Sequence, residues 1–169
     1  MASQSAGTIA EFARYNVWAN LQLLMLCEGL SEAQLQTSAP GAYGTIYDTL
    51  VHIVKADGLY IRLLGGPETP PPFRWEDKPP VADIRRYAES LGPILIETMS
   101  HADPDGIVRQ QWEEGPVAYK AVTVLIQIIN HGVEHRTNIT TILAALGVAT
   151  PDIDGWGYWW MNRDRLGDG

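Results

Sequence analysis

Two histidines, His131 and His135, stand four residues apart inside a long apolar stretch of the chain. In a helix this spacing places both imidazoles on one face, one turn apart, so that both can reach a single metal ion. Apolar residues continue the same face at steps of three and four: Val124, Ile128, Ile139, Ile142 and Leu146. Histidines that face inward need partners, and a metal ion would satisfy both. The pair therefore predicts a metal site; two polar residues on a solvated helix face are the alternative.

A third histidine, His52, falls on the inward row of another predicted helix. Facing helices of a bundle could bring it to the pair, which would give three nitrogen ligands and leave one coordination position open. Such an arrangement is typical of catalytic zinc-type sites, where the ion lowers the pKa of a bound water or thiol. Imidazole suits a divalent transition metal such as zinc, nickel, copper or iron, and we favour zinc or nickel. Cys27 is the only cysteine, so a cysteine-ligated site is excluded.

Glu134 lies between the paired histidines and completes the pattern His-x-x-Glu-His, in which inverzincin peptidases use the glutamate as general base. Such a site takes its third ligand from a glutamate further downstream, and none follows Glu134 in this chain. The peptidase interpretation is therefore disfavoured. Glu134 stays a candidate catalytic residue, as a proton carrier, an acceptor behind the ligands or a fourth ligand. Its alternative role is a surface carboxylate paired with Arg136 or Lys120.

Four long segments carry the helical periodicity that could position these residues. They cover about Thr8–Cys27, Thr45–Leu64, Val81–Ser100 and Val117–Leu146. Gly92-Pro93 should kink or break the third segment, and Ile107–Trp112 could be a short extended piece. Six prolines between Pro67 and Pro80 make that stretch a crossover between the second and third helices. We therefore predict an all-α fold, a four-helix bundle with a long proline-rich crossover, in one domain over residues 1–169.

The bulk composition narrows the expected partners. The 169 residues are 46% hydrophobic and 19% charged, with a net charge of -8. This charge would repel a phosphate backbone, so nucleic acid is not an expected partner. No apolar run approaches the roughly 18 residues of a membrane span, and the first residues do not resemble a signal peptide. We expect a cytoplasmic protein that acts on a small-molecule substrate and has no membrane partner.

The C-terminal segment Trp156–Met161 holds three of the six tryptophans. It could form an aromatic wall of a substrate pocket at the open end of the bundle or cover a homodimer interface, although packing into the core is the default expectation. Asp152 and Asp154 could approach the metal, but turn chemistry around Pro151 explains both adequately.

Three further polar residues have expected structural roles. Asn16 and Asn20 lie beside apolar residues of the first helix, where we expect hydrogen bonds to other helices in preference to substrate contacts. Asp48 precedes His52 by four residues and could orient its imidazole. Capping of the helix that begins near Thr45 is the preferred explanation.

Three segments of the chain resemble signature segments of the DinB/YfiT-like superfamily of metalloenzymes: Tyr15–Asn20, Thr49–Asp57 and Asn130–Arg136. Their order and spacing over most of the chain carry the resemblance. It implies a four-helix bundle with His52, His131 and His135 as the metal triad. The chain departs from many relatives at Glu134 and at Thr137-Asn138, where they have His and Gly-Gln.

Characterised members of the superfamily include bacillithiol S-transferases and a mycothiol-dependent maleylpyruvate isomerase. The resemblance thus implies a low-molecular-weight thiol as a candidate cofactor, and a thiol becomes a thiolate at neutral pH once a divalent cation binds it. Our leading hypothesis is a metal-dependent enzyme that activates a thiol or water nucleophile, as a thiol S-transferase, an isomerase or a hydrolase. A non-catalytic metal-binding or dimerisation module is the alternative. Histidines that only pack in the bundle are a third interpretation.

Overall fold

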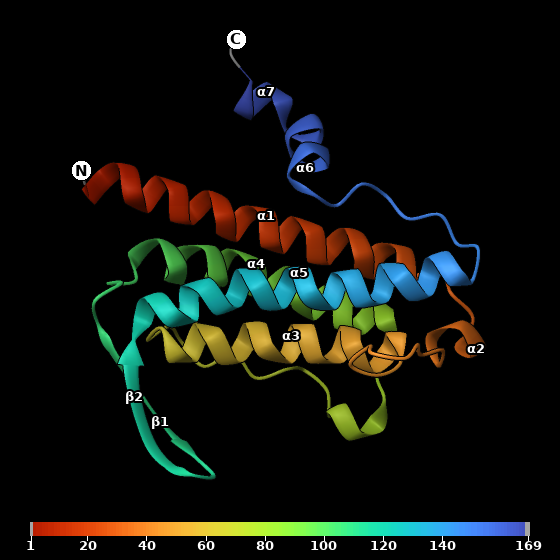
Figure 1. Ribbon diagram of the computed structural model, residues 1–169, viewed down its shortest axis with the longest axis horizontal. Coiled ribbons are helices and arrows are strands. Elements are labelled where there is room, and N and C mark those ends of the chain that lie inside the picture. Colours follow the sequence, from red (N-terminus) through yellow and green to blue (C-terminus); the bar gives the residue numbers. More distant parts are fainter. Residues whose placement is uncertain (1, 168–169) are drawn as a thin grey trace.

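The computed structural model describes residues 2–167, with side chains described from residue 7 onward. In this part of the chain four long helices lie side by side as a bundle (Figure 1). They are α1 (Ala2–Glu28), α3 (Ile46–Leu63), α4 (Val81–His101) and α5 (Ala121–Ala145). The predicted all-α fold, a four-helix bundle, is therefore confirmed, with one small β-hairpin added to it.

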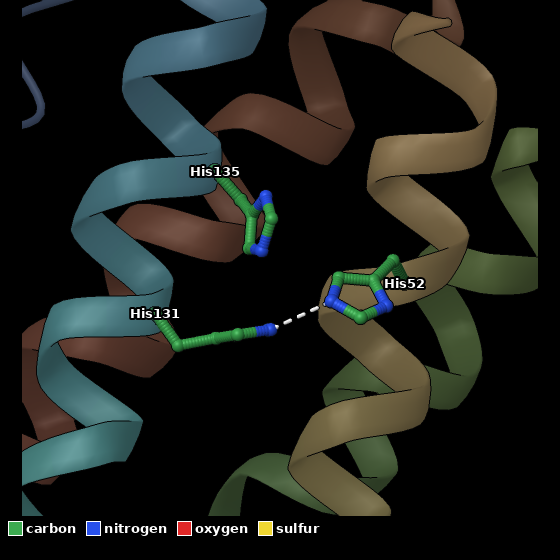
Figure 2. A group of neighbouring side chains, drawn as sticks. All are labelled: His52, His131 and His135. Carbon is green, nitrogen blue, oxygen red and sulfur yellow. Dashed lines mark hydrogen bonds between the residues drawn. The ribbon is translucent and has the colours of Figure 1, made fainter. Parts of the chain in front are cut away.

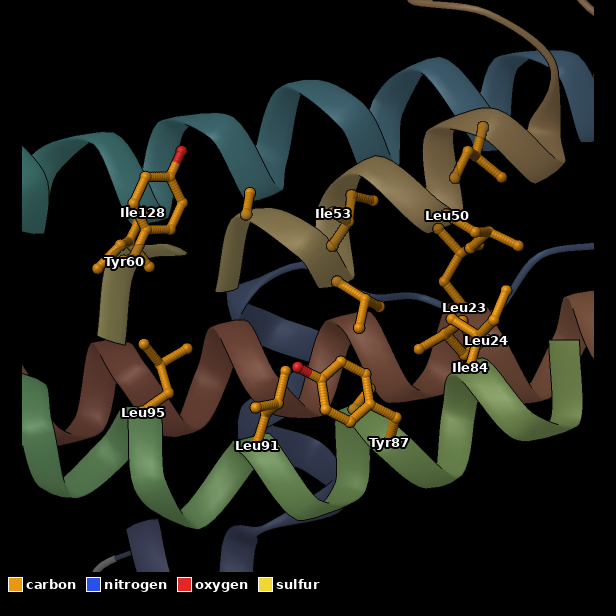
Figure 3. Close-up of a cluster of buried hydrophobic side chains, with 14 of the residues drawn as sticks. Leu23, Leu24, Leu50, Ile53, Tyr60, Ile84, Tyr87, Leu91, Leu95 and Ile128 are labelled. Atoms are coloured by element: carbon orange, nitrogen blue, oxygen red, sulfur yellow. The ribbon is translucent and has the colours of Figure 1, made fainter. Parts of the chain in front are cut away.

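The helices pack in a ring, since α1 and α3 each contact both α4 and α5. Their inward faces form one apolar core at the centre of the bundle (Figure 3). Its most deeply buried side chains include Leu23 and Leu24 from α1, Leu50 from α3, Ile84 and Leu95 from α4, and Ile128 from α5. The predicted stripe on α5 is buried as expected except at its end, where Leu146 is exposed beyond the last helical residue.

Helix α3, which carries His52, begins where the sequence indicates. The backbone N–H of Asp48 donates to the Thr45 hydroxyl oxygen, which caps the helix, and that hydroxyl donates to the Asp48 carboxylate at 2.7 Å. Capping is thus the role of Asp48, because its carboxylate is engaged by Thr45. The short helix α2 (Glu32–Leu35) begins at Ser31 with the reciprocal bonds of a capping box.

Helix α4 passes through Gly92-Pro93 without a break, so a break at this point is a wrong prediction. The ring of Pro93 lies on the exposed side of the helix, where the lost backbone hydrogen bond is tolerated. Gly92 faces α1 at close range, and a Cβ added there would lie 2.8 Å from Cγ1 of Val17. The glycine therefore allows the close approach of α1 and α4.

The last long helix starts later than the periodicity predicts. Strand β1 (Ile107–Trp112) is extended as expected. Residues 117–120, which the sequence pattern placed in the helix, instead belong to strand β2 (Gly115–Lys120). The two strands pair antiparallel, with Val108 opposite Tyr119. Side chains of β2 alternate between half-buried and exposed, as expected for a strand. Because β2 pairs with β1, the helix begins only at Ala121.

Two further segments lie on opposite sides of the bundle (Figure 1). The proline-rich crossover from α3 to α4 contains the short helix η1 (Trp75–Asp77) and runs on the α3 side. Helices α6 (Gly155–Met161) and α7 (Arg163–Leu166) lie beyond α1. Among the described helices, none combines the length and apolar character needed to cross a bilayer.

The C-terminal segment does not pack into the core, so that default expectation is wrong for its tryptophans. Helix α6 rests on the outer side of α1, where only Tyr158 is buried, and Trp156, Trp159 and Trp160 are exposed. A short helix laid on one neighbour can bury only one face. Glu11 of α1 holds it there by accepting hydrogen bonds from Tyr158 and Arg165.

Candidate metal centre

Three histidines from two neighbouring helices meet between α3 and α5 (Figure 2). His52 comes from α3, whereas His131 and His135 come from successive turns of α5, and the three rings face a common space. One ligand nitrogen from each ring lies within 4.8 Å of the other two. Nε2 of His131 and Nε2 of His52 are 2.8 Å apart and share a hydrogen bond. Within residues 2–167, this is the only such group of His, Cys, Asp or Glu side chains.

The spacing of the nitrogens suits a small divalent cation. In a tetrahedral site with metal–nitrogen distances of about 2.1 Å, ligand atoms lie about 3.4 Å from one another. The separations in the triad, 2.8 Å for one pair and at most 4.8 Å, bracket this value. Nδ1 of His135 is buried without a hydrogen-bond partner, so the cluster also holds a ring nitrogen that an ion could satisfy.

The surroundings favour the neutral, ligating form of each histidine. Burial, together with the nearby His135 and His52 rings and the charge of Arg136, lowers the pKa of His131 to about 4. Burial also lowers the pKa of His52, together with the charges of His135 and Lys55. The pKa of His135 is lowered by burial and partly restored by the negative charge of Glu134. All three rings are therefore uncharged near neutral pH and have lone pairs to offer a metal.

The triad is closed on one side and open on the other. His131 and His135 are only 8% and 7% exposed, whereas His52 is half-buried. His52 also lines a cavity of about 620 Å³ whose wall includes Trp75 and Glu76 of η1. Of the three histidines, His52 is therefore the one that faces this cavity, on the side of α3 and the crossover.

Glu134 does not join the three histidines. Its side chain is exposed on α5, and it lies outside the group of candidate ligands. Glu134 is a surface carboxylate, as the alternative role has it, but it pairs with neither Arg136, which bonds to two asparagines, nor Lys120, which pairs with Asp105. The structure therefore places Glu134 close enough to influence His135 electrostatically, and its catalytic role stays a prediction.

Tyr43, which no sequence pattern indicated, covers the triad from the loop before α3. Its ring stacks on His52 with centroids 4.1 Å apart and meets His135 edge-on at 5.0 Å. The backbone N–H of Tyr43 donates to the Asn138 side chain at 2.9 Å, which ties this loop to α5. A loop residue has no periodicity to mark it, so only its closeness to the start of α3 could have drawn attention to it.

Behind the triad, a buried polar network joins three helices. The Arg136 guanidinium donates to the side-chain oxygens of Asn16 at 2.7 Å and Asn20 at 2.6 Å. The Asn20 amide in turn donates to the Asp57 carboxylate at 3.2 Å. The expected interhelical role of Asn16 and Asn20 is confirmed, whereas Asp57 and Arg136 were not anticipated. Arg136 directly follows His135, so the network fixes the helix turn that presents this histidine.

Two features of the network reflect its burial and close packing. Burial raises the pKa of Asp57 to about 7, against the hydrogen bond from Asn20 and the charge of Arg136. Gly132 provides the space, because a Cβ there would overlap Oδ1 of Asn16 and lie 2.6 Å from Nη1 of Arg136. The glycine between the two histidines, a visible feature of the sequence, is thus required by side chains behind the site.

The C-terminal segment contributes nothing to the triad. Its tryptophans line a separate cavity of about 560 Å³ with Trp18 of α1, which contains none of the three histidines. Asp154 caps α6 by accepting a hydrogen bond from the Gly157 N–H at 2.8 Å. Asp152 lies beside it in the same cavity. The tail therefore forms no wall at the triad and neither carboxylate joins it, and the cap at Asp154 agrees with the preferred explanation by turn chemistry.

One comparison with known proteins bears on the whole chain. The family model described as DinB family matches residues 1–166. The match includes all four long helices and the three clustered histidines. No curated protein matches the sequence.

Proposed function

The chain belongs to the DinB family, and on this premise we propose that it binds a divalent metal ion through His52, His131 and His135. The observation that carries the proposal is the meeting of three imidazoles from two helices within 4.8 Å. Their lowered pKa values support it, since neutral imidazole is the form that binds metals. Zinc and nickel are the metals we propose, on the chemistry of the nitrogen donors.

We further propose that the site is catalytic. A divalent ion bound there would supply Lewis-acid chemistry, which lowers the pKa of a coordinated water or low-molecular-weight thiol. Two observations support catalysis over a purely structural role. No fourth His, Cys, Asp or Glu joins the triad among the described residues, and a cavity large enough for a small molecule lies beside His52. Thiol transfer, isomerisation and hydrolysis are the reaction classes consistent with such a site.

The chain's own residues have separate tasks in this proposal. The triad holds the ion, and Tyr43 shields His52 and His135 from solvent. The network around Arg136 keeps α5 in register behind the ligands. Glu134, exposed beside His135, is proposed as the group that carries a proton to or from solvent.

A non-catalytic dimerisation module is the second candidate. It is favoured by apolar side chains exposed on α5 and α6, among them Ile126 and Trp156 at 57% and 79% exposure. Such a protein would still bind metal but would turn over no substrate. Sedimentation of the metal-loaded protein, together with the activity screen below, separates the two candidates.

Metal content tests the first part of the proposal. Wild-type protein, His131→Ala and His101→Ala are purified without chelator and compared by elemental analysis. His101 is the matched control, because it is exposed at the end of α4 and remote from the triad in the fold. We expect close to one metal ion per chain in the wild type and in His101→Ala, and none in His131→Ala. Equal metal content in wild type and His131→Ala, with both folded by circular dichroism, would overturn the proposal.

Turnover tests the second part. Zinc-loaded and nickel-loaded protein is assayed with low-molecular-weight thiols and electrophilic acceptors, and separately with ester and amide substrates. Activity that is absent from His131→Ala and present in His101→Ala supports an enzyme. Stoichiometric metal without turnover in any assay would assign the chain to the binding module instead.

A further inference from the structure

The cavity beside His52 has an unusual lining for a chain of net charge -8. It lies between the first half of α3, the loop before it and η1 of the crossover. Aromatic side chains form much of its wall: Tyr43, Tyr47 and Trp75. Of the chain's three lysines, two, Lys55 and Lys78, are on the same wall. The lining also holds two carboxylates, Asp48 and Glu76, so what matters for a ligand is which of these charges are already paired.

The two lysines approach the cavity from different elements. Lys55 follows His52 by nearly one turn of α3, and its ammonium lies 5.4 Å from the centroid of the Trp75 ring. Lys78 caps the end of η1 with φ of 48°, a left-handed conformation that a non-glycine residue rarely adopts. Neither lysine forms an ion pair with a carboxylate among the described residues. Both ammonium groups are available to an anionic ligand.

The two acidic residues of the cavity balance the formal charge of the lysines but are paired with other groups. The Asp48 carboxylate accepts hydrogen bonds from the Thr45 hydroxyl, which directs it to the helix cap. Glu76 lies 3.8 Å from the Arg74 guanidinium. Their negative charges still contribute to the cavity, which would make it less favourable for a dianion than for a single negative charge. This mixture of positive and negative side chains favours a carboxylate, which carries one negative charge, over a phosphate dianion.

We propose that this cavity binds a small organic acid, whose carboxylate is held by Lys55 and Lys78 and whose apolar body lies among Tyr43, Tyr47 and Trp75. The role of this acid as substrate rests on the proposed metal site, because His52 belongs to both. The binding itself requires only the side chains of the cavity. Its volume, about 620 Å³, is sufficient for a molecule with one aromatic ring.

The test uses benzoate as the acid, benzamide as its uncharged analogue and inorganic phosphate as the dianion. Binding to the full-length protein is followed by amide chemical-shift titration at pH 7, in metal-free and in zinc-loaded samples. The variant is Lys55→Gln/Lys78→Gln. Its matched control is Arg109→Gln/Lys120→Gln, which removes two positive charges from the hairpin and its end, outside the cavity.

We expect wild-type protein to bind benzoate at least fivefold more tightly than benzamide or phosphate, a range typical of partly exposed charge pairs. The cavity variant should lose this preference, and the hairpin control should keep it. Equal affinities for benzoate and benzamide in the wild type would overturn the inference. So would an unchanged benzoate affinity in the cavity variant, or lysine-dependent binding that favours phosphate.

Zinc affinity is measured on the same preparations by competition with a chromogenic chelator. Lysine-dependent benzoate binding in a protein that fails to bind zinc would support the cavity and overturn the metal site. Tight zinc binding without a preference for benzoate would leave the metal site standing and overturn the cavity. The two proposals therefore fail in distinguishable ways.

Discussion

The Nε2 atoms of His52 and His131 are 2.8 Å apart, although 79 residues separate them in the chain. At this distance one ring must donate a proton and the other must accept it, so two protonated rings cannot coexist there. Protons and the proposed metal ion would therefore compete for the same lone pairs. In the metal-free protein, the cost of protonating these buried rings makes stability depend on pH in a predictable direction.

Acid should destabilise the metal-free protein through His131. Its folded-state pKa of about 4 lies below the ordinary value of 6.5, so the unfolded chain binds the proton more readily between these values. The stabilisation is complete above about pH 6.5 and is lost as the pH falls toward 4. Urea denaturation at pH 7 and pH 4.5 should show wild-type protein losing about 2 kcal/mol more than His131→Asn, whose side chain does not titrate. Parallel losses in both proteins would contradict this.

Asp57 should have the opposite pH dependence. Its folded-state pKa is raised by burial from 3.8 to about 7, so the folded protein holds the proton more tightly than the unfolded chain. Stability falls as the pH rises between these values. Compared with Asp57→Asn, wild-type protein should lose about 1–2 kcal/mol from pH 5 to pH 8 in urea denaturation. Asp164→Asn, at an exposed position of α7, should follow the wild type.

Gly132→Ala should be strongly destabilising even though alanine favours helix formation. The new Cβ would overlap Oδ1 of Asn16 and force the Arg136 network apart, at a cost of about 2–3 kcal/mol. Gly7→Ala is the control, because its Cβ meets nothing within 4 Å in α1, and it should stabilise by about 0.5–1 kcal/mol. Thermal denaturation of both variants measures the difference. A Gly132→Ala protein as stable as wild type would show that the network is not required.

Tyr43→Ala should speed metal exchange more than it weakens metal binding. The ring covers His52 without belonging to the ligand group, so its removal opens the triad to water and chelator. We expect zinc removal by excess chelator to become about tenfold faster, with the equilibrium affinity changed about threefold or less. Tyr43→Phe keeps the stacked ring and should behave as wild type. A slow, wild-type rate in Tyr43→Ala would refute the shielding role.

The sequence was informative wherever a pattern repeats along a helix. Steps of three and four located the long helices and the face that carries His131 and His135, and Thr45 marked the start of α3. The same reasoning failed over 115–120, because the partly buried Val117 and Tyr119 fit a strand as well as the first turn of a helix. Only pairing with β1 decides between these structures.

Tertiary contacts supplied the rest of the candidate site. Arg136 would ordinarily be placed on the surface, and only the two asparagines of α1 explain its burial. Tyr43 reaches the triad through a loop whose path depends on Asn138. The outward position of the C-terminal tryptophans likewise depends on where Glu11 anchors α6, which no local pattern indicates.

The origin of the triad in α3 and α5 also has a consequence for biosynthesis. His52 leaves the ribosome long before His131 and His135, and helix α4 must emerge between them. A nascent chain that ends before α5 contains one of the three imidazoles and cannot offer the complete set. If the triad binds an ion as proposed, binding through all three histidines can occur only after translation has passed His135.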